Sequence, residues 1–375
     1  MRFSLLITLS RKYRLRDYQF RLVGCVVALT IIGILVIGSA NESYRQKQIL
    51  GLILGLLVMT VVSVWDYNYF LQFYWLIYAI NIGFLLMVKI FGDSSGGSQR
   101  WIDFGFIRFQ PSELTKILMI LFLAEYLTHH KDDLSRLKTI IQTLALIAVP
   151  VLFIVKQPDM STSIVVLAVC MTLYFLAGLS AKIVGGALAI GIPSFAIFFY
   201  LATRTDQTLI SNYQFLRIMA WLYPEEYPQS AYQQQNSITA VGSGCLLGKG
   251  LYNTDVSSVK NGNFISEPQT DFIFAVLGEE LGFVGTCAVI VLLFLISILC
   301  IYTGYKASNM QGKLIGYGIG SLISIQSFFN ICVVTGLLPN TGLPLPFVSY
   351  GLTSLVSLFL GIGFVLNVGL QRAKY

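Results

Sequence analysis

The chain has 375 residues, of which 55% are hydrophobic and only 11% are charged. A soluble domain carries about 25% charged residues, so this chain has too few polar side chains to cover a water-facing surface. Its mean hydropathy is +0.73, and apolar runs recur that are about as long as the 20 residues a helix needs to cross a bilayer core. The composition predicts a polytopic membrane protein and excludes a soluble enzyme, a nucleic-acid-binding protein and a disordered scaffold.

The net charge of +7 comes largely from bases at the start of the chain. Six of them precede or open the first apolar run: Arg2, Arg11, Lys12, Arg14, Arg16 and Arg21. Under the positive-inside rule such a cluster marks a cytoplasmic segment, so no nucleic-acid partner is needed to explain it. The six cysteines show no spacing typical of metal ligands.

Ten apolar segments predict an all-α polytopic membrane protein, a single integral membrane domain over residues 1–375. The segments are 22–38, 48–65, 70–91, 113–129, 138–156, 161–179, 183–202, 271–303, 312–337 and 349–371. The first ends in Gly38-Ser39-Ala40, which resembles a signal cleavage site, but it exceeds a signal core and other spans follow, so we expect it to stay uncleaved. A cytoplasmic N-terminus and ten crossings place the C-terminus in the cytoplasm as well.

The predicted outer face carries most of the polar and irregular sequence. The loop 203–270, between spans 7 and 8, is the longest connection, and the outer loops 92–112 and 338–348 are rich in Gly, Pro and polar residues. Irregular backbone and ionisable groups are costly in lipid, so a functional site is expected where they gather. Gly312, Gly316 and Gly320 instead predict close packing between helices.

The first candidate site opens the fourth span. Pro111 and Ser112 suit a helix N-terminus, and Trp101 suits the membrane interface. Lys116 follows Glu113 by three residues on the same helix face, about one turn into the membrane. Such a pair should face protein or water rather than lipid. The sequence leaves open whether it is structural or part of a functional site.

The second candidate site lies where the long outer loop meets the eighth span. Asp271 has the position of a helix cap, which is its simplest structural explanation. It also lies at the outer mouth of the bundle, where a polar substrate could reach it. Glu279 and Glu280 lie about two turns deeper, and pairing with bases from neighbouring helices is their structural alternative.

These motifs together resemble the SEDS family, the RodA/FtsW/SpoVE-type proteins that polymerise peptidoglycan, over nearly the whole chain. The matching stretches, in order, are Arg100-Trp101-Ile102, Gln110-Pro111-Ser112-Glu113, Gln157-Pro158-Asp159, Tyr213-Gln214 with Arg217, Tyr232-Gln233-Gln234, Gly242-Ser243-Gly244, Gly248-Lys249-Gly250, Thr270-Asp271-Phe272-Ile273-Phe274, Gly278-Glu279-Glu280-Leu281-Gly282, Leu338-Pro339 and Gly342-Leu343-Pro344-Leu345-Pro346-Phe347-Val348-Ser349-Tyr350-Gly351. The last stretch is the most diagnostic.

The resemblance implies a glycosyltransferase that acts on lipid II at the outer face of the bacterial cytoplasmic membrane, with a class B penicillin-binding protein as its partner. Asp271 matches the essential loop aspartate of the family. Trp101, Glu113 and Lys116 match positions important in the family, and Asp159 and Ser349 lie in its motifs. We expect these last five residues to bind the substrate or to line its cavity.

The chain departs from the family pattern at several positions. Ser266-Glu267-Pro268-Gln269 precedes Thr270-Asp271, where the family usually has Pro-Glu-x-His, and Leu352-Thr353-Ser354 replaces Gly-Ser-Ser. Asn340 stands where Val is frequent. Asp271 is retained, but assignment to a subfamily is weakened. The Arg108-Phe109-Gln110 context favours the RodA-like elongation branch over the division or sporulation branch.

Chemistry for the expected reaction requires a base and stabilisation of a leaving diphosphate. Asp271 is the predicted general base, and Arg100, Arg217 or Lys249 is expected to hold the diphosphate. A divalent cation such as Mg²⁺ could share that work, although no ligand set is evident. The competing predictions are a lipid-linked precursor flippase or transporter, whose key ionisable groups should lie near the midplane, and a non-catalytic scaffold.

Overall fold

The computed structural model describes residues 18–95, 98–103, 105, 108–204, 210–253, 258, 260–262 and 264–371. The predicted cytoplasmic bases up to Arg16, and Arg372 and Lys374 at the other end, lie outside the described residues.

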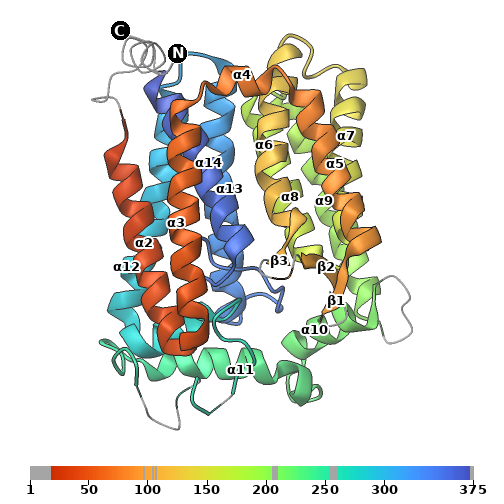
Figure 1. Cartoon of the computed structure of the whole chain (residues 1–375). Coiled ribbons are helices and arrows are strands. Elements are labelled where there is room, and N and C mark those ends of the chain that lie inside the picture. Colours follow the sequence, from red (N-terminus) through yellow and green to blue (C-terminus); the bar gives the residue numbers. More distant parts are fainter. Residues whose placement is uncertain are drawn as a thin grey trace.

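Ten long helices among the described residues correspond one to one to the ten predicted segments, and most of them run side by side (Figure 1). They are α2 (Phe20–Ala40), α3 (Glu42–Val64), α5 (Tyr74–Phe91), α6 (Pro111–His129), α7 (Leu137–Lys156), α8 (Met160–Leu176), α9 (Ala181–Ala202), α12 (Ile273–Tyr305), α13 (Met310–Val334) and α14 (Leu352–Leu370). Eight are long and apolar enough to cross a membrane. The exceptions are α8, which has 17 residues, and α6, which contains three charged residues. The helical membrane fold is confirmed, whereas the count of ten crossings stays a prediction.

The short helix α4 (Tyr67–Leu71) breaks the third predicted segment near its start. It begins because the Asp66 side chain accepts a hydrogen bond from the Asn68 amide, as an N-cap does. At this end of the bundle Asn68 also donates to Gln371 Oε1 at 3.0 Å, and Gln19 donates to Thr303 Oγ1 at 2.6 Å. The two described ends of the chain therefore share one end of the bundle, as an even number of crossings requires.

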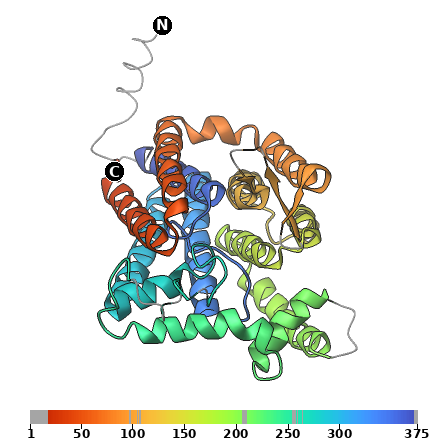
Figure 2. The same ribbon diagram turned by 60° about the horizontal axis from the view of Figure 1, so that its bottom comes forward.

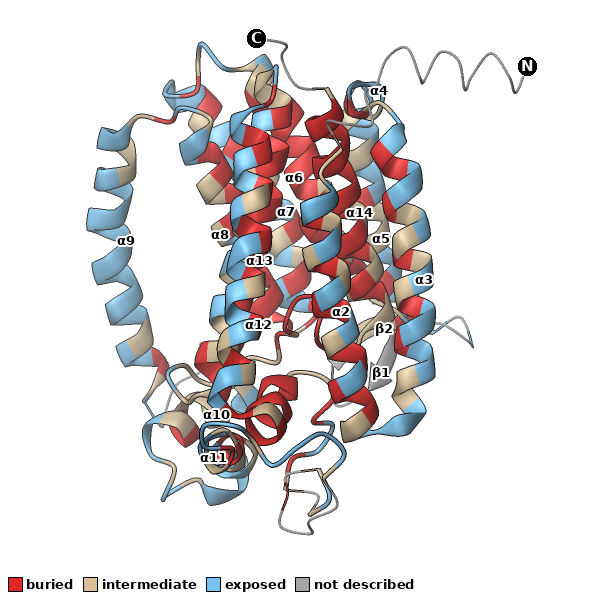
Figure 3. Cartoon of the chain, turned by 90° about the vertical axis from the view of Figure 1, so that its left-hand side faces the viewer, coloured by how far each residue is buried: buried red, intermediate tan, exposed pale blue. Residues whose placement is uncertain are grey.

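The interior of the bundle is formed by α6, α13 and α14, whose buried faces Figure 3 shows in red. In contrast, α9 stands apart from the bundle in that view, and Ala202 is its one buried residue. The predicted glycine packing on α13 is confirmed. A Cβ atom on Gly316 would lie 2.5 Å from the Cα atom of Gly304 on α12, so α12 and α13 touch through their backbones here.

The predicted outer loops contain secondary structure of their own. In the loop 92–112, β1 (Asp93–Ser95), β2 (Ser98–Asp103) and β3 (Arg108–Phe109) form an antiparallel sheet in the order β1-β2-β3. In the long loop, α10 (Asn212–Leu222) and α11 (Pro228–Ser243) follow one another, and α11 runs across the end of the bundle opposite α4 (Figures 1 and 2). Neither the sheet nor these two helices was predicted from the sequence.

A break in α12 at Gly282 divides this helix into a short first segment and a long second one. Gly282 has φ 64° and ψ −164°, a backbone conformation almost restricted to glycine. The adjacent loop compensates for the lost helical hydrogen bonds. The amides of Lys249 and Gly250 donate to the carbonyls of Glu279 and Glu280, both at 2.9 Å. The backbone is thus satisfied inside the protein, as membrane depth demands.

The two acids at this break are paired with bases, although these come from the long loop rather than from neighbouring helices. Lys249 Nζ lies 2.8 Å from Glu279 Oε1. Lys260 forms an ion pair with Glu280, which also accepts a hydrogen bond from Ser39 at the end of α2. The pairs join the long loop to the first segment of α12.

Candidate active site

A polar cavity of about 450 Å³ lies at the end of the bundle where the sheet, α10 and the first segment of α12 meet. Its lining combines four acids, two arginines and several amides and hydroxyls with few apolar side chains. The lining residues are Arg100, Trp101, Gln110, Glu113, Asp159, Thr162, Tyr213, Arg217, Gln233, Ser266, Glu267, Thr270, Asp271, Phe272, Gly342, Pro344, Tyr350, Gly351, Thr353 and Ser354. Six of the nine predicted site residues are therefore brought together here, from five separate segments of the chain.

Asp271 lies in the turn that leads into α12 and is half-buried. Phe272, rather than Asp271, holds the N-cap position of this helix. Its backbone carbonyl accepts a hydrogen bond of 2.7 Å from Asn330 on α13. The side chain points toward Gly342, where a Cβ atom would lie 3.3 Å from Asp271 Oδ2 and 3.8 Å from Arg217 Nη1. Gly342 has φ 74°, so glycine both permits this turn and leaves room for the carboxylate and the guanidinium.

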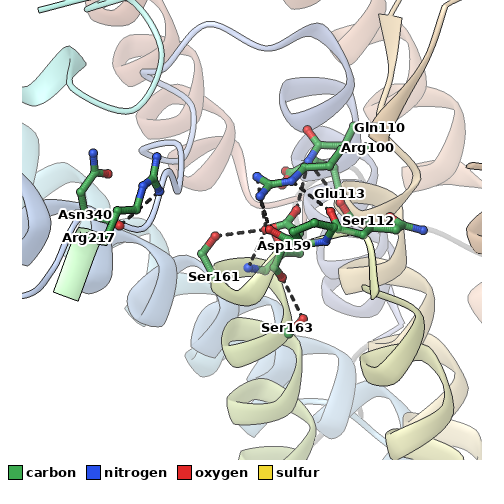
Figure 4. Close-up of polar contacts among 12 residues, drawn as sticks. Arg100, Gln110, Ser112, Glu113, Asp159, Ser161, Ser163, Arg217 and Asn340 are labelled. Carbon is green, nitrogen blue, oxygen red and sulfur yellow. Dashed lines mark hydrogen bonds and ion pairs between the residues drawn. The ribbon is translucent and has the colours of Figure 1, made fainter. Parts of the chain in front are cut away.

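Arg217 is held on α10, which begins with a capping box formed by Ser211 and Gln214. Its guanidinium donates to the Asn340 carbonyl at 3.2 Å and lies 4.4 Å from the centre of the Tyr213 ring. Burial lowers the pKa of Arg217 from its usual value, and Asp271 and Tyr213 counteract this effect. An arginine pKa starts so high that the side chain stays charged at neutral pH. Arg217 and Arg100 lie on opposite sides of the view in Figure 4.

Asp159, Arg100 and Gln110 form the other wall of the cavity (Figure 4). Asp159 caps α8 by accepting a hydrogen bond from the Thr162 amide at 3.2 Å, and it also accepts one from Gln110 Nε2 at 3.4 Å. Arg100 Nη1 lies 3.9 Å from Asp159 Oδ1. The same guanidinium donates to the carbonyls of Gln157 and Pro158, so Arg100 fastens the sheet to the start of α8.

Glu113 and Lys116 form a buried ion pair beneath the cavity floor, with Lys116 Nζ 2.8 Å from Glu113 Oε1. Lys116 also donates to Gln326 on α13 at 2.7 Å, and Gln326 donates to the Pro344 carbonyl at 2.9 Å. Glu113 lines the cavity whereas Lys116 does not. Glu113 Oε2 is buried and accepts no hydrogen bond from the described residues. The pair therefore connects the cavity wall to the loop after α13.

Two other predicted residues lie outside the cavity lining. The hydroxyl of Ser349 donates to the Thr270 carbonyl and accepts from the Leu345 amide, both at 2.7 Å, so it ties the loop before α14 to the turn that carries Asp271. Lys249 is directed at Glu279 instead. The structure does not bring Lys249 together with Arg217 and Arg100.

Four polar residues around this site were not among the predicted site residues: Gln110 and Tyr350, which lie in the quoted motifs, and Gln326 and Asn330, which do not. Gln326 and Asn330 are four residues apart on one face of α13 and are fully buried. Two amides inside an apolar span are costly and tend to be functional, so their spacing could have identified them. Burial raises the pKa of the Tyr350 phenol, and the neighbouring Tyr44 raises it further.

Carboxylates around the cavity do not form an evident metal site. No group of three or more His, Cys, Asp or Glu side chains among the described residues is arranged to hold a metal ion. The acids lining the cavity belong to separate walls, and Asp159 and Glu113 are engaged by Arg100 and Lys116. A role for a divalent cation remains a prediction.

Comparison with known proteins identifies the family. The sequence model of the FtsW, RodA and SpoVE proteins, described as cell cycle protein, matches residues 18–374. The chain belongs to this family. It is 35% identical over 351 residues to the peptidoglycan glycosyltransferase MrdB of Escherichia coli (strain K12), with 92% of each chain covered. It is 33% identical over 362 residues to stage V sporulation protein E of Bacillus subtilis (strain 168), covering 92% of this chain and 95% of that protein.

Solved structures of the family share this fold. A chain from a peptidoglycan synthase complex, studied for the structural coordination of polymerization and crosslinking, has a TM-score of 0.78 at 26% identity and covers 94% of this chain and 97% of its own. The rod shape determining protein RodA of Thermus thermophilus has a TM-score of 0.71 at 24% identity, with 96% and 98% covered. The resemblance seen in the sequence is confirmed, and the chain is a multi-pass bacterial membrane protein.

Proposed function

We propose that this protein is a peptidoglycan glycosyltransferase that polymerises lipid II at the outer face of the cytoplasmic membrane, with Asp271 as its catalytic base. The observation that carries the proposal is the arrangement of Asp271 and Arg217, an acid and a half-buried cation that both lie next to Gly342 in one polar cavity. Membership of a family that includes a peptidoglycan glycosyltransferase supports the reaction. The cavity lies at the end of the bundle opposite the one where both described termini lie. If those termini are cytoplasmic, the cavity is on the outer side of the membrane.

The reaction joins the 4-hydroxyl of one lipid-linked sugar to the anomeric carbon of another. A new C–O bond forms at that carbon while its bond to the diphosphate oxygen breaks, and undecaprenyl diphosphate leaves with the bonding electrons. Asp271 takes the proton of the attacking hydroxyl. A carboxylate is a weak base, so proton transfer takes place late, when the hydroxyl has become acidic through attack. Positioned general bases contribute about 10²- to 10⁴-fold to rate.

Arg217 is the better of the two cavity arginines for the departing diphosphate. Arg100 is already engaged by the Asp159 carboxylate and by two backbone carbonyls. Among the described residues Arg217 forms no ion pair within 4.0 Å and donates to one carbonyl. It therefore retains free donors, and a guanidinium fork matches two phosphate oxygens. Because it is half-buried, its interaction with the developing charge is screened less by water than at the surface.

The remaining predicted residues support this geometry. The Glu113–Lys116 pair and Asp159 hold the cavity walls, and Trp101 offers an apolar ring at the cavity edge for a sugar face. The elongation branch is favoured by the 35% identity with MrdB, against 33% for the sporulation protein. A class B penicillin-binding protein as partner is supported by the fold shared with a chain from a complex of polymerization and crosslinking.

The test uses purified protein, with and without a cognate class B penicillin-binding protein, in liposomes that contain lipid II. Glycan chains are resolved on gels for wild type, Asp271→Asn and Asp103→Asn, with and without EDTA. Asp103 is an exposed acid of β2 that does not line the cavity, so it serves as the matched control. We expect ladders from wild type and Asp103→Asn, and a loss of about 100-fold or more for Asp271→Asn.

Other outcomes would redirect the assignment. Full activity of Asp271→Asn would remove it as the base and make Glu267, the exposed acid at the cavity edge, the next residue to test. Absence of ladders from every variant, with partner and divalent cation present, would contradict polymerisation. A lipid II translocation assay would then test the flippase alternative. Ladders that disappear with EDTA would establish the cation requirement.

A further inference from the structure

Asn330 and Gln326 form an amide pair on α13 that no part of the reaction described above uses. Both are fully buried, and because they are four residues apart they lie on the same face of the helix. Burying a side-chain amide in an apolar span costs free energy unless the amide is hydrogen-bonded. Their partners are backbone carbonyls of the segments that build the cavity.

Asn330 joins two segments that have no regular structure to hold them. Its Nδ2 donates one hydrogen bond to the Asp271 carbonyl at 2.7 Å and another to the Leu343 carbonyl at 2.6 Å. One amide group with two hydrogens thus fixes the separation between the turn before α12 and the loop after α13. Leu343 directly follows Gly342, the residue next to which both the Asp271 carboxylate and the Arg217 guanidinium lie.

Gln326 extends the same connection by one helical turn. It donates to the Pro344 carbonyl, the next along the chain after that of Leu343, and accepts from Lys116. Successive carbonyls of the loop are therefore held by successive turns of α13, which is packed against α6 and α8 in the interior. The loop cannot move away from α13 without breaking these bonds.

We propose that Asn330 is the positioning residue of Asp271: by bonding the carbonyls of Asp271 and Leu343 it sets the distance from the carboxylate to Arg217. This inference rests on the proposed function, in which Asp271 is the base and Arg217 binds the diphosphate. Removing the amide leaves both groups present but frees the turn and the loop to separate. A displacement of about 1 Å can cost 10²-fold in rate.

The test compares Asn330→Leu with a control that loses an equally buried amide elsewhere. Asn367 on α14 lies at the opposite end of the bundle, is fully buried, and donates to the Ser63 carbonyl at 2.8 Å. Each variant is purified with its partner, and kcat and KM for lipid II are measured from initial rates of glycan formation. Thermal unfolding in the same detergent reports the cost to stability, and Asp271→Asn is included in every series.

For Asn330→Leu we expect kcat to fall about 100-fold with KM within about threefold of wild type, the pattern of a lost transition-state interaction. Asn367→Leu should lose similar thermal stability but keep its kcat. Asn330→Gln, which retains an amide on a longer side chain, should recover part of the rate. If Asn330→Leu does not fold, Asn330→Ala replaces it under the same criteria.

Two results would overturn the inference. One is wild-type kcat in Asn330→Leu while Asp271→Asn is inactive, which leaves the proposed function intact. The other is an equal loss of kcat in Asn330→Leu and Asn367→Leu, which shows a structural effect alone. Full activity of Asp271→Asn would instead contradict the proposed base, and the positioning role with it.

Discussion

Lys249 and Glu279 are joined twice, through their side chains and through their backbones. Lys249 Nζ lies 2.8 Å from Glu279 Oε1, and the Lys249 amide donates to the Glu279 carbonyl at 2.9 Å. The second bond is available because the break at Gly282 frees that carbonyl from the helix. Lys249 is thereby committed to the segment of α12 that follows Asp271, rather than to the cavity where the sequence analysis expected it.

Replacing Lys249 with Met should therefore affect stability more than substrate binding. The change leaves the buried Glu279 carboxylate without its cation, and we expect a loss of about 2 kcal/mol in the free energy of unfolding. KM for lipid II should stay within about twofold of wild type, because Lys249 does not line the cavity and its loss removes no contact that binds the substrate. Thermal unfolding and initial polymerisation rates test this. Adding Glu279→Leu should restore part of the stability, and a large rise in KM would return Lys249 to the diphosphate site.

The long helices could be predicted from the sequence because bilayer thickness imposes both length and apolar composition. The segments 113–129 and 138–156 agree with α6 and α7 to within two residues at each end. Outside the apolar core this constraint disappears. The helix α11 has few apolar residues in its sequence, and β1 to β3 are two to six residues long. Their formation depends on packing against the bundle, and this packing leaves no periodic pattern of apolar residues in the sequence.

For the site, prediction succeeded where a residue's role follows from its place along the chain. Asp271 precedes an apolar span, and Lys116 follows Glu113 by one turn, so both positions could be inferred. The partner of Lys249 could not, because 30 residues separate it from Glu279. The same holds for Asn330, whose two carbonyl partners lie 59 and 13 residues away. Side-chain direction in loops depends on tertiary contacts that a single sequence does not specify.

Arg217 offers a test of the diphosphate assignment. Arg217→Ala should lower kcat by about 100-fold, since removing one preorganised donor from a charge-stabilising site costs 10²–10³. Arg217→Lys should recover only part of this loss, because an ammonium keeps the charge but loses the planar fork and the contact with Tyr213. Arg136→Ala, an exposed arginine between α6 and α7, serves as the control and should retain wild-type rate. Wild-type activity of Arg217→Lys would contradict bidentate binding, and wild-type activity of Arg217→Ala would remove Arg217 from the diphosphate site.

Tyr67 should make the fold sensitive to alkaline pH. Burial raises its pKa from 10.0 to about 12, although Asn309, to which its hydroxyl donates at 2.7 Å, acts to lower it. The folded state thus holds this proton more tightly than the unfolded state. Its stabilisation is complete below pH 10 and is lost as pH rises to about 12. The stability of wild type relative to Tyr67→Phe should fall by about 2–3 kcal/mol over that interval. Thermal unfolding of both proteins at each pH measures this difference, and a constant difference would contradict it.

Gly282 should tolerate no side chain, because two independent constraints act on it. Its φ of 64° and ψ of −164° are almost restricted to glycine. A Cβ atom there would also lie 2.3 Å from the amide nitrogen of Gly248. Relief of that overlap would pull the loop off α12 and expose the carbonyls of Glu279 and Glu280. We expect Gly282→Ala to lose at least about 3 kcal/mol of stability, or to fail to fold.

Gly191 on α9 provides the control for this substitution, since nothing lies within 4 Å of its added Cβ. Gly191→Ala should be neutral or stabilising by up to about 1 kcal/mol, as for alanine in a helix interior. Thermal unfolding of both variants and of Gly248→Ala gives the comparison. Gly248 has φ 79°, and its Cβ would lie 2.2 Å from the Glu280 carbonyl oxygen, so it should behave like Gly282. If Gly282→Ala were as stable as Gly191→Ala, the close contact between loop and helix would not be required. The turn that carries Asp271 would then have to be held by its contacts with Asn330, Ser349 and Tyr350.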